Sequence, residues 1–174
     1  MSEVLQRLVQ TLRFERDAFV WMDFNDRATG DALILVVVTQ VLILLGGGSS
    51  LLGLVGSLPR VISVMLEALI FWLVFSGIAY AAAKYLFRGD GAYATYLRIA
   101  GFAYPTLLLL LFTTRFIGNG SLAFLAGSLW FLAIVAYGIH YISDLDLVKS
   151  AACSGFGIVG WVIISAIFSG GLIF

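Results

Sequence analysis

The sequence predicts an all-α integral membrane protein, a bundle of five transmembrane helices preceded by an amphipathic helix at the membrane surface. Hydrophobic residues make up 61% of its 174 residues and charged residues only 11%, whereas a soluble domain carries about 25% charged residues. This apolar excess is too large for a protein core, so much of it must face lipid. The length suits one domain, with residues 1–30 forming the amphipathic helix and a turn, and residues 31–174 forming the bundle.

The N-terminal segment has the spacing of an amphipathic helix. Its apolar residues recur every three or four positions, at Val4, Leu5, Leu8, Val9 and Leu12. Two arrangements stay open. The helix either lies in the inner headgroup layer or docks on the protein's own spans. The polar run DFNDRATGD that follows predicts a turn, with Asp31 as the N-cap of the first span.

Five long apolar segments follow the turn. A helix needs about 20 apolar residues to cross a bilayer, and four of the five segments reach that length. The third is short and contains Pro105, and the first is overlong, so the run GGGSS from Gly46 should end its helix. The segments are Ala32 to Pro59, Val61 to Ala83, Ile99 to Thr114, Phe116 to Ile139 and Ser150 to Phe174.

The basic residues predict an orientation, because cytoplasmic loops of membrane proteins carry an excess of lysine and arginine. With five spans and the N-terminus inside, eight of the ten basic residues lie on the inner side and only Arg60 and Arg115 on the outer side. The C-terminus then lies outside. The charge count separates this layout only weakly from a four-span alternative without the third segment, and we expect five spans.

The run GFGIVG, Gly155 to Gly160, matches a dinucleotide-binding fingerprint letter for letter. That motif requires a preceding strand and an acidic residue about 20 positions later, and this run lies in the last apolar segment with no acidic residue after it. Small residues in a membrane helix instead let neighbouring backbones approach closely. We therefore expect Ala151, Gly155, Gly157 and Gly160 to form a helix-packing surface.

The inner loop FRGDGAYATYLRIAGFAYP, residues 87–105, combines glycines, aromatics and a proline. Gly89 and Gly91 predict a tight turn, and a short amphipathic helix should follow it. Gly101 and Pro105 are expected to interrupt the helix beyond.

This loop, with its glycine turn and its Gly-aromatic-Ala-x-Pro entry to the third span, resembles the Yip-domain family of membrane proteins that interact with Rab GTPases. The run YGIHYISDLDLVKSA, residues 137–151, is similar to the family's penultimate loop. The resemblance implies one five-span helical module without established catalysis. A long N-terminal extension, usual in eukaryotic members, has no counterpart here. We therefore expect a prokaryotic inner membrane, with the endoplasmic reticulum or Golgi as the alternative.

Glu67 is the ionisable residue expected deepest within a span. An ionised side chain at membrane depth is costly and usually marks a functional site. The structural alternative is an ion pair near the outer interface. Arg60 lies seven positions earlier on the same helical face, and Arg115 enters from the same side of the membrane.

His140 is the single histidine, expected at the inner end of the fourth span. Asp144 lies four positions later, so the two side chains are expected to pair across one helical turn at the interface. Neither residue predicts catalysis, because no nucleophile is placed beside a base. One histidine and one cysteine do not make a zinc site. Most tryptophans and several tyrosines, among them Trp72 and Tyr104, are expected to lie at the membrane boundaries.

These features favour a non-enzymatic membrane protein that acts through helix packing, as an interaction or accessory subunit of a membrane assembly. Its expected partners are the bilayer and other membrane proteins or a second copy, with no cofactor. The formal net charge of zero gives no reason to expect nucleic acid. The alternative is a small transporter or channel with Glu67 in the path of an ion or proton.

Overall fold

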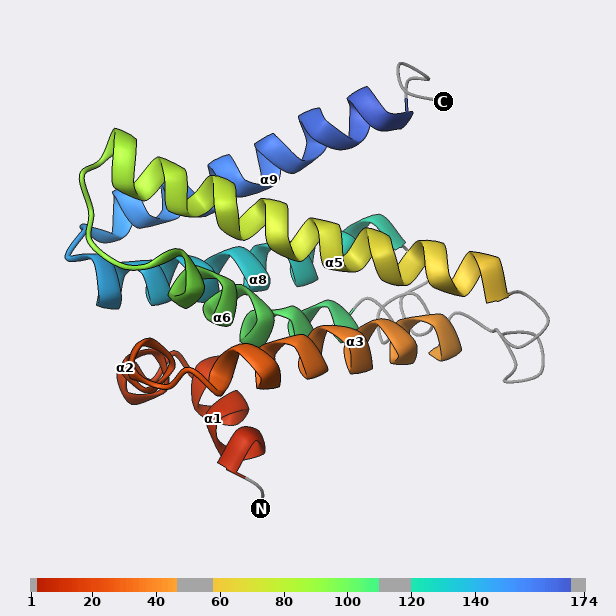
Figure 1. Cartoon of the computed structure of the whole chain (residues 1–174), viewed down its shortest axis with the longest axis horizontal. Coiled ribbons are helices and arrows are strands. Elements are labelled where there is room, and N and C mark those ends of the chain that lie inside the picture. The colour runs from red at the N-terminus through yellow and green to blue at the C-terminus, as the bar shows by residue number, and fades with distance from the viewer. Residues whose placement is uncertain (1–2, 47–57, 110–119, 170–174) are drawn as a thin grey trace.

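A computed structural model describes residues 3–46, 58–109 and 120–169, and over these ranges the chain is helical, without a strand. Figure 1 shows α3, α5, α8 and α9 running lengthwise beside one another, with α6 among them. The elements are α1 (Glu3–Leu12), α2 (Arg16–Phe24), α3 (Ala28–Gly46), α5 (Leu58–Ala81), the π-helical η1 (Ala82–Leu86), α6 (Tyr93–Ala103), the 3₁₀-helical η2 (Tyr104–Leu108), α8 (Gly120–Ser143) and α9 (Leu147–Ser169). The prediction of an all-α protein is confirmed.

Within the described residues, four helices are long and apolar enough to cross a membrane, so the chain has the character of a membrane protein. They cover Ala28–Gly46, Leu58–Leu86, Leu125–Ser143 and Leu147–Ile167. They correspond to the first, second, fourth and fifth spans expected from the sequence. The run GGGSS, which was expected to end the first span, lies outside the described residues apart from Gly46.

The third expected span is built differently, from α6 followed by η2. The interruption predicted for Gly101 and Pro105 occurs near Pro105, because α6 continues through Gly101 and ends at Ala103. Pro105, two residues later, has no N–H to donate to the carbonyl of Gly101. The N–H of Tyr104 donates a hydrogen bond to the Gly101 carbonyl instead. The backbone therefore tightens into a 3₁₀ turn.

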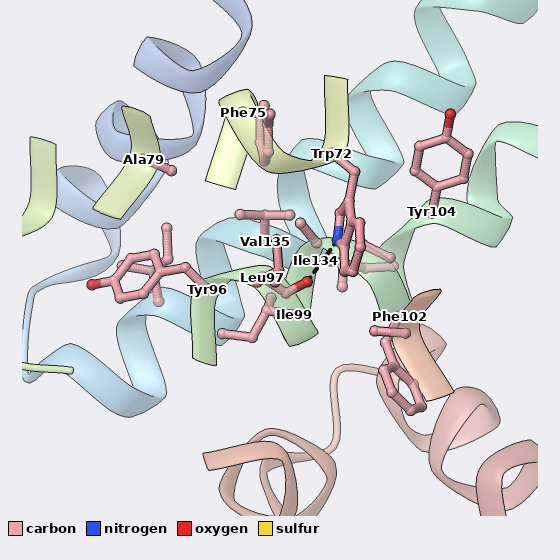
Figure 2. Packing of buried hydrophobic residues seen from close by; sticks show 14 of the residues in the cluster. Trp72, Phe75, Ala79, Tyr96, Leu97, Ile99, Phe102, Tyr104, Ile134 and Val135 are labelled. Carbon is pink, nitrogen blue, oxygen red and sulfur yellow. Dashed lines mark hydrogen bonds between the residues drawn. The ribbon is translucent and has the colours of Figure 1, made fainter. Parts of the chain in front are cut away.

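α6 occupies the centre of the bundle. All its residues from Thr95 to Ala103 are buried, and it packs against α3, α5 and α8. Gly101 permits the approach of α3, because a Cβ added there would lie 2.5 Å from the Cβ of Ala32. Trp72 of α5 donates a hydrogen bond of 2.8 Å from its indole nitrogen to the Leu97 carbonyl, as Figure 2 shows. Trp72 is therefore a core residue, and its predicted place at the membrane boundary is wrong.

The N-terminal segment forms two helices rather than one, with a break at Phe14, whose φ is +60°. α2 buries Ala18, Phe19 and Met22 completely and packs against α6 and α8. Of the two arrangements expected for the N-terminal segment, α2 therefore adopts docking on the protein's own bundle. α1 also packs on the core through one side, but Leu5 remains 47% exposed on the other. That second apolar side is free to contact the headgroup layer.

The turn between α2 and α3 is held by Arg98 of α6, which is only 5% exposed. Its Nη1 donates to the carbonyls of Met22 and Asp23 at 2.8 and 3.2 Å. Its Nε donates to Thr29 Oγ1 at 2.8 Å, and its Nη2 contacts Asp26 Oδ1 at 2.7 Å. The guanidinium thus joins the centre of the bundle to α2, the turn and α3.

The start of α3 differs from the prediction. The helix begins at Ala28, so Asp31 lies inside its first turn and is not the N-cap. The preceding turn is stabilised locally, because Asn25 Oδ1 accepts a hydrogen bond of 3.1 Å from the N–H of Arg27. A carboxylate in the first turn still interacts favourably with the helix dipole.

Candidate functional site

A cavity of about 580 Å³ lies between α3, α5, η2, α8 and α9. Most of its wall is aliphatic or aromatic, and four polar side chains also line it. These are Gln40, Glu67, Tyr104 and Ser128, one each from α3, α5, η2 and α8. Three of these helices, α3, α5 and α8, are candidate membrane spans.

Tyr104 is directed into this cavity by the 3₁₀ turn that begins at that residue. The side chain is 4% exposed, and its hydroxyl donates to Gln40 Oε1 at 3.3 Å. Figure 2 shows the ring pointing away from Phe102, which lies two residues earlier on α6. The prediction that Tyr104 lies at the membrane boundary is therefore wrong, because its polar end is satisfied inside the bundle.

Aromatic rings form the wall next to Glu67. Phe71 lies one helical turn after Glu67 on α5. Its ring centroid is 5.3 Å from that of Trp161 in an edge-to-face arrangement, 6.0 Å from Phe131 and 6.1 Å from Tyr104. All four of these aromatic residues line the cavity. The Glu67 side chain and these aromatic rings thus line the same cavity.

Glu67 and Trp161 also line a second, outward-facing groove of about 420 Å³ between α5 and α9. The two helices are in close contact further along, where Gly157 packs on Phe75 and Gly160 on Ile78. Beyond this crossing, the C-terminal half of α9 leads away from α5, as Figure 1 shows. Glu67, whose side chain is exposed, therefore lines both the cavity and the outward-facing groove.

The predicted ion pair of Glu67 with Arg60 does not form. Seven residues of helix separate them by about 10 Å, and Arg60 is exposed at the start of α5. Among the residues that the structure describes, the ion pair joins Arg98 to Asp26. Arg115, the other expected partner, lies outside the described residues. In the described part of the chain, the Glu67 carboxylate is not neutralised by a basic side chain.

The chain was compared with protein-family models, curated proteins and solved structures. None of them matches.

The four small residues of the last helix divide into two pairs. A Cβ added to Gly157 would lie 2.6 Å from Phe75, and one added to Gly160 would lie 2.3 Å from Ile78. These two glycines pack within the chain. Gly155 has nothing within 4 Å of such a Cβ, and Ala151 is exposed. The predicted packing role does not extend to these two residues, because they face away from α5.

At one end of the bundle, the loop before α6 and the loop between α8 and α9 pack against each other. Gly91 adopts a φ of +113°. There is no room for a side chain at Gly89, because a Cβ added there would lie 2.9 Å from the Leu145 side chain. The Tyr96 hydroxyl lies 2.6 Å from Ser143 Oγ. Both glycines therefore serve the turn that the sequence predicted.

His140 and Asp144 do not pair, contrary to the prediction. α8 ends at Ser143, and Asp144 then takes a φ of +51°, which directs its exposed side chain away from the helix. The Nδ1 of His140 donates instead to the carbonyl of Leu145 at 2.6 Å. Asp146 caps α9, because its carboxylate accepts the N–H of Lys149 at 2.8 Å. The contacts of His140 and Asp146 thus stabilise the loop between α8 and α9.

Sequence reasoning identified Glu67 but missed the rest of the cavity wall. Gln40 is the amide side chain within the first apolar run, and a polar group at membrane depth is itself a signal of function. Trp161 and Tyr104 were expected at the boundaries. Ser128 gave no signal, because isolated serines are common in membrane helices. No group of three potential metal-binding side chains occurs in the part of the chain that the structure describes.

Proposed function

We propose that this chain is a non-enzymatic membrane protein, a small transporter, which binds its solute in the Glu67 cavity. The observation that carries the proposal is a carboxylate at membrane depth that no described basic residue neutralises. It lies between a cavity inside the bundle and a groove on the lipid-facing surface. Intramembrane ionisable residues mark substrate and ion pathways.

The dimensions and lining of the cavity support this proposal. Small-molecule sites are mostly apolar cavities of about 300–1,000 Å³ with a few placed polar groups, and this cavity has about 580 Å³. The irregular backbone at η2, which supplies Tyr104, adjoins it. Transporters use such interruptions of membrane helices to build sites at membrane depth.

Glu67→Gln should abolish solute flux in proteoliposomes while leaving the protein folded, because glutamine keeps the shape and removes the negative charge. The measurement compares uptake of protons, alkali cations and organic solutes by vesicles that contain either protein. Glu15→Gln is the matched control, since Glu15 is exposed between α1 and α2, away from the cavity. Unchanged flux in Glu67→Gln, or no flux of any solute with the wild-type protein, would contradict the proposal.

We also propose five membrane crossings, with the N-terminus inside and the C-terminus outside, in a prokaryotic inner membrane. α6 begins beside the inner end of α8, where Tyr96 contacts Ser143. The next described residue after Leu109 is Gly120, at the opposite end of α8, which is about 36 Å long. The chain must travel the length of α8 between these points. α6 and η2 together span about 26 Å, close to the thickness of the hydrocarbon core.

Thiol labelling in intact cells should confirm this topology. In a Cys153→Ser background, a membrane-impermeant maleimide should label cysteine placed at the exposed Arg60 but not at Gln6 or Lys149. A reporter fused after Phe174 should lie outside. Labelling of Lys149→Cys from outside, or a reporter on the same side as Gln6, would contradict five crossings.

A second candidate function is that of an interaction or accessory subunit. The observation that favours it is the outward groove, where Glu67 is open to a basic side chain from a neighbouring helix. The partner would be another membrane protein or a second copy. Glu67→Gln should then release a partner that co-purifies in mild detergent. A wild-type preparation that contains only monomers would contradict this candidate.

We further propose kinship with the Yip-domain family. The support is the inner-loop motif and the element order, in which an amphipathic segment precedes the bundle. The two loops that carry the resemblance meet at one end of the molecule, through Gly89, Asp90 and Ser143.

A further inference from the structure

We propose that the solute of the Glu67 cavity is an amphipathic organic cation, a protonated amine or a quaternary onium ion with an apolar body. This inference rests on the proposed function and specifies its substrate class. The cationic centre would lie at Glu67, and the apolar part would fill the cavity between α5, α8 and α9.

The charge of the site requires a positive group. Among the residues that the structure describes, Glu67 is the acidic side chain that lines the cavity and the outer groove, and no basic side chain lines either of them. An anionic solute would be repelled by the carboxylate, and a neutral one would leave its charge unpaired at membrane depth, which is costly. A cation supplies the missing counter-charge.

The aromatic wall selects an organic rather than an inorganic cation. Ca²⁺ and Mg²⁺ need about six or more oxygen ligands. This cavity offers Glu67, Ser128 and the Tyr104–Gln40 pair, whose amide oxygen already accepts a hydrogen bond. The rings of Phe71 and Trp161 lie 5.3 Å apart beside the carboxylate. Ring faces of this kind attract alkylated ammonium groups, which inorganic cations with tightly held water do not match.

The route of entry also suits an amphipathic molecule. Glu67 and Trp161 belong to both the inner cavity and the outer groove between α5 and α9. Further along, the close contact of Gly157 with Phe75 closes this helix pair. A molecule dissolved in the bilayer can therefore reach Glu67 laterally, through the groove. Hydrophobic cations concentrate in membranes, whereas hydrated inorganic ions do not.

The test uses two probes of similar size and shape but opposite charge, tetraphenylphosphonium and tetraphenylborate. Binding to the full-length protein in nanodiscs is measured by equilibrium dialysis against empty nanodiscs. We expect saturable binding of tetraphenylphosphonium and none of tetraphenylborate. Glu67→Gln should weaken the binding of the cation by about tenfold or more, because the ion pair is lost. Glu15→Gln should bind like the wild type, and Glu67→Asp should retain part of the affinity.

A second variant tests the site in a way that does not depend on the folding of Glu67→Gln. Trp161→Phe, which retains an aromatic ring, should reduce the quenching of protein fluorescence by a quencher-labelled phosphonium without abolishing binding. Equal binding of both probes, or full affinity in Glu67→Gln, would overturn the inference. Flux of protons or alkali cations that depends on Glu67, without phosphonium binding, would overturn the substrate class and leave the transporter proposal intact. Phosphonium binding without flux of any solute would support the site and contradict transport.

Discussion

Replacing Arg98 with methionine should lower the free energy of unfolding by about 3 kcal/mol. The side chain donates to the carbonyls of Met22 and Asp23 and to the Thr29 hydroxyl from a buried position. Methionine fills similar space but leaves the acceptors that Arg98 satisfies in the α2–α3 turn without a donor. The N-terminal helices should therefore detach before the rest of the bundle unfolds.

The matched variants separate the buried hydrogen bonds from the surface ion pair. Asp26 is fully exposed, so Asp26→Asn should have little effect on stability. Arg98→Lys should be intermediate, because an ammonium group cannot donate to three sites in the fixed geometry of a guanidinium. Stability is measured by denaturation in mixed micelles. Labelling of Ala18→Cys, at a fully buried position, in a Cys153→Ser background reports detachment of α2. An unchanged midpoint in Arg98→Met would contradict the assignment.

The course of the main spans could be predicted from the sequence because lipid imposes one local rule. A run of about 20 apolar residues must be helical there, since the backbone has no other hydrogen-bond partner. This rule identified α3, α5, α8 and α9. It also identified the third segment as unusual, through Pro105, although the interruption starts later than Gly101 suggested.

The roles of individual polar residues could not be predicted, because their partners are distant in the sequence. Arg98 counted only as an inner basic residue, yet its partners lie about 70 positions earlier. Trp72 and Tyr104 carry the sequence signature of boundary residues, and each finds a hydrogen-bond partner inside the bundle instead. The residue type indicates which side chains can lie at a membrane boundary. The packing of the helices determines where the polar groups of these side chains find hydrogen-bond partners.

The surroundings of Glu67 in the cavity could not be predicted from the sequence either. Glu67 was identified from its cost in lipid, which is a property of one residue. Its setting depends on how η2 turns Tyr104 and how α9 crosses α5 at Gly157 and Gly160. The fingerprint-like run GFGIVG thus contributes to the site indirectly. Its glycines bring α9 close to α5, and Trp161 follows immediately on the wall of the cavity.

Gly101→Val should destabilise the bundle by about 1–3 kcal/mol and also weaken any binding that depends on the cavity. Even the Cβ of valine would lie 2.5 Å from the Ala32 Cβ and 3.1 Å from its Cα. Alanine has no flexible end that could move aside, so α3 and α6 must separate. The control is Gly155→Val, where nothing lies within 4 Å, and it should leave the unfolding midpoint close to that of the wild type.

The functional part of this prediction follows from chain connectivity. Tyr104 lies three residues after Gly101, and its hydroxyl reaches Gln40 on the same helix α3 that the new side chain would displace. Separation of α3 from α6 should therefore break the Tyr104–Gln40 hydrogen bond and open that wall of the cavity. Phosphonium affinity and the unfolding midpoint, measured on the same preparations, should fall together in Gly101→Val and remain unchanged in Gly155→Val. A loss of stability with full affinity would show that the contact between α3 and α6 does not position Tyr104.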